Sequence, residues 1–380
     1  MLDTYSLRLP GRVHAGLDAL SSLSGIVERE GAHSVLLLSD KGVAAGGLVD
    51  LVTKHIGVPC RIIDDIPSEP ACDAVQAIAA QAAGEDELIV AVGGGSVMDT
   101  AKLVGVLGPE LTVRDLLKDP SCARKRRRTV MIPTTCGTGS EATCNAIVLV
   151  PEEELKVGIV SDAMIADYVI LDPVIVASLP RRIAASTGLD ALCHAIECYT
   201  GAKANPFSDL FALEAMRLIF PSIVEACREG GSAEAKGAML IAAFYGGVAI
   251  TSSGTTAVHA LSYPLGGRYH IAHGVSNAML LAPVMRFNAP SCTARLARVW
   301  DDCICTGGHD LSDEEKAGRV IARLEEIVGE LDIPRLSSFG ITQEDIPPLA
   351  KAGLEVTRLM VNNPRKMDQS EAEAIFREAL

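Results

Sequence analysis

Residues 88–102 read LIVAVGGGSVMDTAK, and this stretch decides the fold of the N-terminal half. The five apolar residues 88–92 predict a buried β-strand, and the residues after the glycines predict a helix that begins directly at the turn. Consecutive glycines let the backbone approach a phosphate closely, and the positive end of the helix stabilises its charge. The stretch therefore predicts an α/β fold with a phosphate-binding turn, although its spacing differs from the common GxGxxG fingerprint.

The pattern of apolar runs on either side of this stretch indicates two domains. Up to about residue 180, short apolar runs alternate with amphipathic stretches, which predicts a mainly parallel sheet. The predicted strands are residues 35–38, 60–63, 88–92, 129–132, 146–150 and 168–171. Beyond that point, stretches rich in Ala, Leu and Glu predict helices over residues 209–219, 233–244, 313–331 and 370–380. We expect an α/β dinucleotide-binding domain over 1–180 and an all-α domain over 181–380.

Charge and hydropathy exclude two classes of partner. The net charge is −14, from 34 basic and 48 acidic residues, so nucleic acid and membrane surfaces are poor partners. We interpret the one basic run, residues 124–128, as a solvated loop. Residues 237–258 carry no charge, but their second half contains the hydroxyl cluster 251–256. We therefore expect a buried helix followed by a packed turn there, and no membrane span.

Cysteine usage and the N-terminus predict a cytoplasmic protein. The eleven cysteines are an odd number and form no CxxC pair, which is typical of reduced thiols. Residues 1–10 include Asp3 and Arg8 and lack the apolar segment of a signal peptide.

Two further loops favour a nucleotide site. Residues 132–141, IPTTCGTGSE, close another predicted strand with four hydroxyls and two glycines, although hydroxyl-rich turns also serve as helix caps. Asp40 follows the strand 35–38, where a carboxylate accepts hydrogen bonds from an adenosine ribose and repels a 2′-phosphate. The cofactor expected is therefore NAD. The candidate cofactor-binding residues on the three loops are Asp40, Gly94, Gly95, Ser96, Thr134, Thr135 and Thr138.

A metal constellation is expected in the helical half. Asp190 and His194 are four residues apart, which places a carboxylate and an imidazole on one face of a helix. His259 and His273 are separated by Pro264 and two glycines, so they sit on separate elements that can fold back together. Each histidine taken alone is better explained as a hydrogen-bonded core residue. Taken jointly, one Asp and three His predict a site for Fe²⁺ or Zn²⁺.

These motifs resemble those of the iron-containing (group III) alcohol dehydrogenase family, which includes lactaldehyde reductase and 1,3-propanediol dehydrogenase. The resemblance covers nearly the whole chain. The matching stretches are residues 93–102, 133–141, 188–197 (GLDALCHAIE), 259 with 264–266, 273–274 and 363–365. The resemblance implies a dehydroquinate synthase-like fold, a metal held by the four residues above, and a homodimer. It also implies that Asp99, Asn145 and Lys156 line the cofactor site.

The sequence departs from the family pattern near the last two histidines. Tyr263 stands where many relatives carry a further histidine in the substrate pocket. Tyr263 and His270 are the candidate proton-relay residues, but a route through water or the cofactor ribose needs neither. Arg268 stands where alcohol-active relatives have apolar or amide side chains. A guanidinium binds oxyanions bidentately. We therefore expect Arg268 to contact a substrate that carries a carboxylate, sulfonate or phosphonate.

The combined motifs predict an NAD-dependent oxidoreductase that interconverts a short-chain primary alcohol and its aldehyde. Hydride would pass between substrate and nicotinamide across an interdomain cleft, and the metal would stabilise the alkoxide. Two alternatives stay open. The first is a dehydroquinate synthase-like lyase, against which the spacing of the Asp and His residues argues. The second is a non-enzymatic scaffold that binds a nucleotide or a metal.

Overall fold

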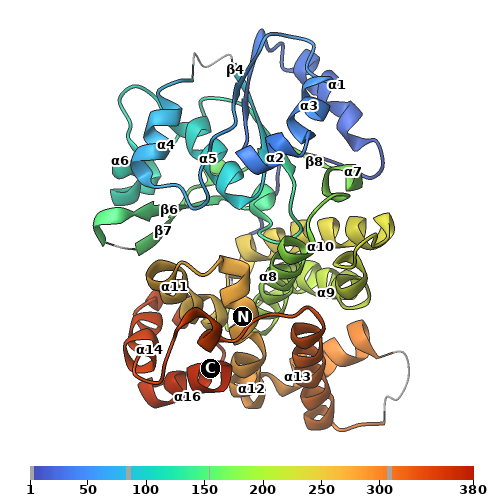
Figure 1. The fold of residues 1–380 in the computed structure, drawn as a ribbon, viewed down its shortest axis with the longest axis vertical. Coiled ribbons are helices and arrows are strands. Elements are labelled where there is room, and N and C mark those ends of the chain that lie inside the picture. Colours follow the sequence, from blue (N-terminus) through green and yellow to red (C-terminus); the bar gives the residue numbers. More distant parts are fainter. Residues whose placement is uncertain (1–3, 83–86, 154, 306–309) are drawn as a thin grey trace. The chain divides into compact units, whose positions relative to one another are not determined.

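The computed structural model describes residues 4–82, 87–153, 155–305 and 310–380 (Figure 1). The chain forms two compact units: Arg8–Leu179 is one, and Pro180–Leu380 together with the N-terminal segment up to Leu7 is the other. The sequence assigns this N-terminal segment to the first domain, whereas the structure places it with the helical unit. The reason is aromatic packing, because the Tyr5 ring meets the edge of Phe207 with centroids 5.3 Å apart.

A six-stranded parallel sheet forms the centre of the α/β unit, with the order β1-β8-β5-β4-β2-β3. All seven residues of β4 are buried, as expected of a central strand covered by helices on both faces. The strands of the sheet are β1 (Arg12–Ala15), β2 (Ser34–Leu38), β3 (Cys60–Ile63), β4 (Glu87–Gly93), β5 (Thr129–Pro133) and β8 (Tyr168–Leu171).

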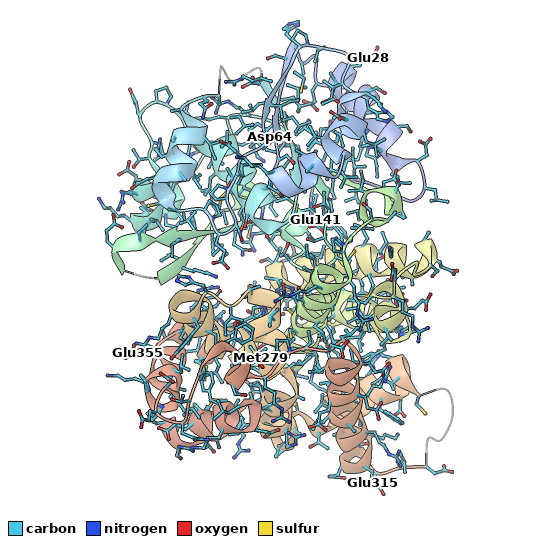
Figure 2. All side chains as sticks on the ribbon, in the orientation of Figure 1. Glu28, Asp64, Glu141, Met279, Glu315 and Glu355 are labelled. Carbon is cyan, nitrogen blue, oxygen red and sulfur yellow. The ribbon has the colours of Figure 1, made fainter. Side chains whose placement is uncertain are left out.

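Helices pack on both faces of this sheet. Leu88, Val90 and Val92 alternate along β4 and share one buried cluster with α1 (Ser22–Arg29) and α3 (Leu48–Thr53). A second cluster joins three helices to a β-hairpin. The remaining helices of the unit are α2 (Lys41–Ala45), α4 (Cys72–Ala79), α5 (Gly95–Val106), α6 (Val113–Lys118) and α7 (Pro173–Val176). In Figure 2, Glu141 lies inside this unit, whereas Glu28 projects from its surface.

The strand predicted over 146–150 does not join the parallel sheet. It forms β6 (Asn145–Val150), which pairs antiparallel with β7 (Leu155–Val160) as a separate two-stranded ribbon. Only alternate residues of β6 are buried, a pattern typical of a strand with one covered face. Ala146 and Val148 belong to the second cluster, so this ribbon covers α4, α5 and α6.

The described residues of the second unit form helices and connecting loops, with no strand among them. Helix α8 (Arg181–Thr200) is buried continuously from Gly188 to Thr200 and packs against α9, α10 and α12. Met279 of α12 points into the interior, whereas Glu315 lies on the surface (Figure 2). The other helices are α9 (Pro206–Ala226), α10 (Ala233–Ser253), α11 (Ala257–Tyr269), α12 (His273–Val299), α13 (Asp313–Glu330), α14 (Ile346–Leu354), α15 (Thr357–Met360) and α16 (Gln369–Ala379).

Helix α10 is the one described helix that is long and apolar enough to cross a membrane by length and composition. It packs against α8 and α9, and most of its apolar residues are buried there. The uncharged stretch noted in the sequence therefore supplies a core helix of this unit, followed by the turn that leads into α11.

Candidate functional site

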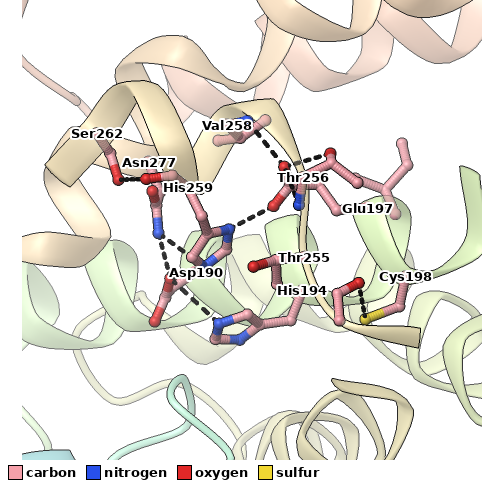
Figure 3. Close-up of polar contacts among 12 residues, drawn as sticks. Asp190, His194, Glu197, Cys198, Thr255, Thr256, Val258, His259, Ser262 and Asn277 are labelled. Carbon is pink, nitrogen blue, oxygen red and sulfur yellow. Dashed lines mark hydrogen bonds and ion pairs between the residues drawn. The ribbon is translucent and has the colours of Figure 1, made fainter. Parts of the chain in front are cut away.

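Three helices bring the four predicted metal ligands together. Asp190 and His194 lie one turn apart on α8, His259 lies in the first turn of α11, and His273 is the first residue of α12. One ligand atom from each residue lies within 4.8 Å of the ligand atoms of the other three. Figure 3 shows the Asp190, His194 and His259 side chains converging on one point between α8 and α11.

The geometry of this cluster fits a single metal ion. The Asp190 Oδ1 atom lies 3.9 Å from the His194 Nε2 atom and 3.7 Å from the Nε2 atoms of His259 and His273. Ligands bound to one ion at about 2.0–2.2 Å lie up to about 4.4 Å from each other, so these separations suit one shared ion. Nitrogen and oxygen donors without sulfur suit Fe²⁺ or Zn²⁺.

The four ligands differ in burial, and the cluster is open to solvent on the side of His273. Asp190, His194 and His259 are 2–5% exposed, whereas the His273 side chain is 35% exposed. Burial raises the pKa of the Asp190 carboxyl, but the three neighbouring imidazoles outweigh this effect and hold its pKa below the usual range. Asp190 therefore remains a carboxylate, and a small molecule can approach from the His273 side.

Glu197, which the sequence analysis leaves without a role, orients His259. Its buried carboxylate accepts hydrogen bonds from the His259 Nδ1 atom, the Thr256 hydroxyl (2.6 Å) and the backbone N–H groups of Thr256 and Val258 (Figure 3). The last two groups belong to the start of α11, so Glu197 also caps this helix. With the proton fixed on Nδ1, the Nε2 lone pair of His259 points into the cluster.

Asn277, also without a predicted role, reaches three of the four ligands. Its Nδ2 atom lies 2.7 Å from Asp190 Oδ1 and 3.2 Å from the Nε2 atoms of His259 and His273. Its Oδ1 atom is buried and has no hydrogen-bond partner in the described part of the chain. Such an orphaned buried oxygen beside four converging donors is consistent with a site built for a bound ion.

Tyr263 lies beside the metal ligands, and its proton-relay role stays a prediction. It follows His259 by one turn of α11, and its ring centroid is 6.3 Å from that of His273. Burial raises the pKa of the Tyr263 hydroxyl, and the hydrogen-bonded Arg358 guanidinium offsets only part of this effect. The phenol therefore stays protonated at neutral pH and can donate a hydrogen bond.

Arg268 lies in the last turn of α11, and its contact with the substrate stays a prediction. Arg268 follows His259 by nine residues, which at about 100° per residue puts it about 180° around α11, on the opposite side. It is exposed, and it shares a hydrogen-bonded surface cluster with Tyr269 and Asp345. The arginine whose charge acts on both His259 and Tyr263 is Arg358, from α15.

His270 lies outside the metal cluster. It is exposed and adopts a left-handed conformation (φ 53°) that ends α11. No hydrogen bond or ring contact joins it to the four ligands in the described residues. Its proton-relay role stays a prediction.

The two loops predicted to bind a cofactor lie against each other in the α/β unit. A Cβ atom on Gly94 would lie 3.5 Å from the Thr135 side chain, and one on Gly95 would lie 3.0 Å from Thr138. The Thr134 backbone N–H donates to the Gly93 carbonyl (3.0 Å). The glycines thus leave space beside the first turn of α5, whose N–H groups have no partner within the helix.

A hydroxyl without a partner in this space is available to a ligand. The Thr135 Oγ1 atom is buried and has no hydrogen-bond partner among the described residues, and it lies beside Gly94. A dinucleotide pyrophosphate suits a helix N-terminus next to free hydroxyls, so the residues present fit the predicted cofactor.

Glu69 links Lys156 to Ser96 in the first turn of α5. The Lys156 Nζ atom lies 2.5 Å from the Glu69 carboxylate, and the Glu69 backbone N–H donates to the Ser96 hydroxyl (3.0 Å). Glu69 has a φ of 54°, a conformation uncommon outside glycine and indicative of local strain. The predicted residues Ser96 and Lys156 are therefore joined by a residue that the sequence did not single out.

Asp99 and Asn145 belong to a buried network. Both Asp99 carboxylate oxygens are occupied, by the Lys102 ammonium (3.1 Å), the Ser140 hydroxyl (2.5 Å) and the Ile147 backbone N–H (2.9 Å). The Lys102 ammonium also donates to the Asn145 carbonyl (2.7 Å). This network fixes α5 to the second loop and to β6. Direct cofactor contacts of Asp99 and Asn145 stay predictions.

Asp40 lies where β2 ends and caps α2. Its Oδ1 atom accepts a hydrogen bond from the Val43 backbone N–H (2.9 Å). The preceding residue, Ser39, donates to the Val92 carbonyl of β4 (2.7 Å), so Asp40 stands at the same sheet edge as the glycine turn.

Comparisons with known proteins agree with this geometry. Residues 10–173 match the family model described as iron-containing alcohol dehydrogenase, and residues 184–380 match the model described as the Fe-containing alcohol dehydrogenase family, C-terminal. The chain is 36% identical to long-chain-alcohol dehydrogenase 1 of Geobacillus thermodenitrificans, covering 97% of this chain and 95% of the relative. It is 32% identical to 1,3-propanediol dehydrogenase of Klebsiella pneumoniae, covering 96% of each chain.

A solved structure shares the whole fold. The sulfoacetaldehyde reductase of Bifidobacterium kashiwanohense, crystallised with NAD⁺, superimposes with a TM-score of 0.89. The two chains are 25% identical, and the match covers 100% of this chain and 99% of the relative. The α/β unit with its parallel sheet and the helical unit predicted from the sequence are therefore confirmed.

Proposed function

This chain belongs to the iron-containing alcohol dehydrogenase family, and we propose that it interconverts a short-chain primary alcohol and its aldehyde with NAD(H) and Fe²⁺. The observation that carries the proposal is the cluster of Asp190, His194, His259 and His273, closed on the buried side and open beside His273. The NAD⁺ bound to the sulfoacetaldehyde reductase supports the cofactor assignment.

The chain's own residues provide binding and orientation. When bound, the metal ion would polarise the substrate oxygen as a Lewis acid, and NAD⁺ would accept the hydride of the alcohol carbon. Glu197 fixes the ring of His259, and Asn277 reaches the same ligands from α12. The Tyr263 hydroxyl, held in its protonated form, can donate a hydrogen bond to a substrate beside His273.

The substrate proposed here carries an anionic substituent. A relative that covers the whole chain acts on sulfoacetaldehyde, in which a sulfonate is attached to a two-carbon aldehyde. Arg268 stands about half a turn around α11 from His259, so a cation nearer to the ligands would be better placed to bind the anionic group.

A steady-state assay tests the proposed function. Purified protein, made metal-free and then loaded anaerobically with Fe²⁺ or Zn²⁺, is given NADH and a panel of short aldehydes, and NADH oxidation is followed. Metal-dependent NADH oxidation is expected. A protein that binds metal and NADH but turns over no alcohol or aldehyde would be a scaffold, and elimination from a phosphorylated sugar acid would indicate the lyase alternative.

Replacing Asp40 by asparagine is expected to relax the preference for NAD. An asparagine oxygen can still cap α2 through the Val43 N–H, but it lacks the charge that would repel a 2′-phosphate. Unit charges about 4 Å apart interact by about 1–4 kcal/mol between water and a partly buried site, so NADP efficiency should rise about tenfold or more. Catalytic efficiencies with both cofactors measure this. Equal efficiencies in the parent would show that Asp40 does not select between NAD and NADP.

We also propose a homodimer formed through the free edge of the sheet. Strand β1 ends the strand order, and three exposed apolar residues lie on or beside it: Leu9 (47%), Val13 (38%) and Leu17 (79%). An open edge strand flanked by exposed apolar residues is a template for pairing with a second copy. Sedimentation is expected to show two copies in the parent and a shift toward one copy in Val13→Lys. A monomeric parent would contradict the proposal.

A further inference from the structure

Arg358 lies beside the metal centre although it is 85 residues from the nearest metal ligand in sequence. Helix α15 (Thr357–Met360) packs against α11, and the charge of the Arg358 guanidinium acts on both the Tyr263 hydroxyl and His259. Tyr263 in turn lies one turn after His259, with its ring 6.3 Å from that of His273. Tyr263 is therefore next to both the metal ligands and the Arg358 guanidinium.

The charge of Arg358 has no acidic partner. Among residues 4–82, 87–153, 155–305 and 310–380, no carboxylate forms an ion pair with it, and its side chain is exposed. The neighbouring Arg365 differs, because it pairs with Glu371 (3.1 Å) and stacks on the Phe287 ring. Arg268 likewise lies with Asp345 in the surface cluster. Arg358 is therefore available to an external anion.

We propose that Arg358 is the residue that recognises the anionic substituent of the substrate, an oxyanion at the far end of a short aldehyde or alcohol. This inference rests on the proposed function. The reacting oxygen of the substrate binds at the open side of the cluster, beside His273 and Tyr263. The oxyanion at the other end of the substrate binds the Arg358 guanidinium. Carboxylate and sulfonate oxygens accept two parallel hydrogen bonds from a guanidinium, which fixes the substrate as well as binding it.

The test compares anionic and uncharged aldehydes of similar length. Succinic semialdehyde and sulfoacetaldehyde are set against butanal and propanal in the parent, Arg358→Gln and Arg358→Lys. A charge-assisted hydrogen bond predicts about 10- to 100-fold preference for the anionic aldehydes in the parent. Arg358→Gln should lose this preference through a higher KM for the anionic aldehydes, and Arg358→Lys should restore part of it. Arg268→Gln is the matched control and should keep the parental ratio.

A binding measurement separates this inference from the proposed function. Calorimetry with butanoate and propanesulfonate, and with the uncharged butanamide, reports binding on the metal-loaded protein without turnover. Selective anion binding that Arg358→Gln abolishes supports the inference even if no aldehyde is reduced, in which case the proposed function fails alone. Rapid turnover of uncharged aldehydes with no anion preference, or an unchanged ratio in Arg358→Gln, overturns the inference and leaves the dehydrogenase in place.

Discussion

Replacing His259 by alanine is expected to remove the bound metal and the turnover together. His259 supplies one of four ligand atoms, and its Nδ1 atom also holds the buried Glu197 carboxylate. Mutating residues that merely support a ligand already lowers metal affinity by about 10- to 100-fold, so loss of the ligand itself should exceed that range. Metal per chain, measured by mass spectrometry after dialysis, and kcat should fall in parallel.

The control for this experiment is His270→Ala. His270 is exposed and lies outside the cluster, so this variant should keep the parental metal content. If His259→Ala retained stoichiometric metal and parental turnover, the ligand set assigned to the site would be incorrect.

Replacing Glu197 by glutamine is expected to weaken metal binding without removing any ligand. The carboxylate accepts hydrogen bonds from His259, Thr256 and Val258 and is 0% exposed. A glutamine of the same shape presents an NH₂ group to one of these donors, so His259 loses its fixed orientation. We expect metal affinity to fall about 10- to 100-fold. The metal-free protein should also lose about 3–5 kcal/mol of unfolding free energy, the usual effect of breaking a buried charged pair.

Competition with a chelator measures the affinity, and urea unfolding measures the stability. Glu234→Gln is a matched control, because Glu234 is exposed in the first turn of α10. It should change neither quantity. Parental metal affinity in Glu197→Gln would show that His259 does not need the carboxylate to bind the ion.

The metal ligands could be predicted because their spacing is a local property. Asp190 and His194 are one helical turn apart, and that turn alone places them on one face. Asn277 follows His273 by the same interval, so the sequence carries the same spacing signal for this residue. Arg358 carries no such signal, since it reaches the site only through the packing of a four-residue helix against α11.

The strands of the fold could be predicted where both faces of a strand are buried. The continuous apolar run of β4 identified the central strand, because both of its faces are covered. The run over 146–150 is almost as apolar, yet it is covered on one face only and pairs with β7. Strand β1 is polar and mostly exposed, so its place in the sheet comes from pairing with β8, which a single strand's composition does not reveal.

The N-terminal segment packs on the helical unit, so it can reach its final position only after that unit has been synthesised. Tyr5 leaves the ribosome early, but Phe207, against which it packs, follows about 200 residues later. At about 5–20 residues per second this delay is about 10–40 s, during which the intervening α/β unit can form. Residues 4–7 are thus secured to the helical unit only after the α/β unit that follows them has been synthesised.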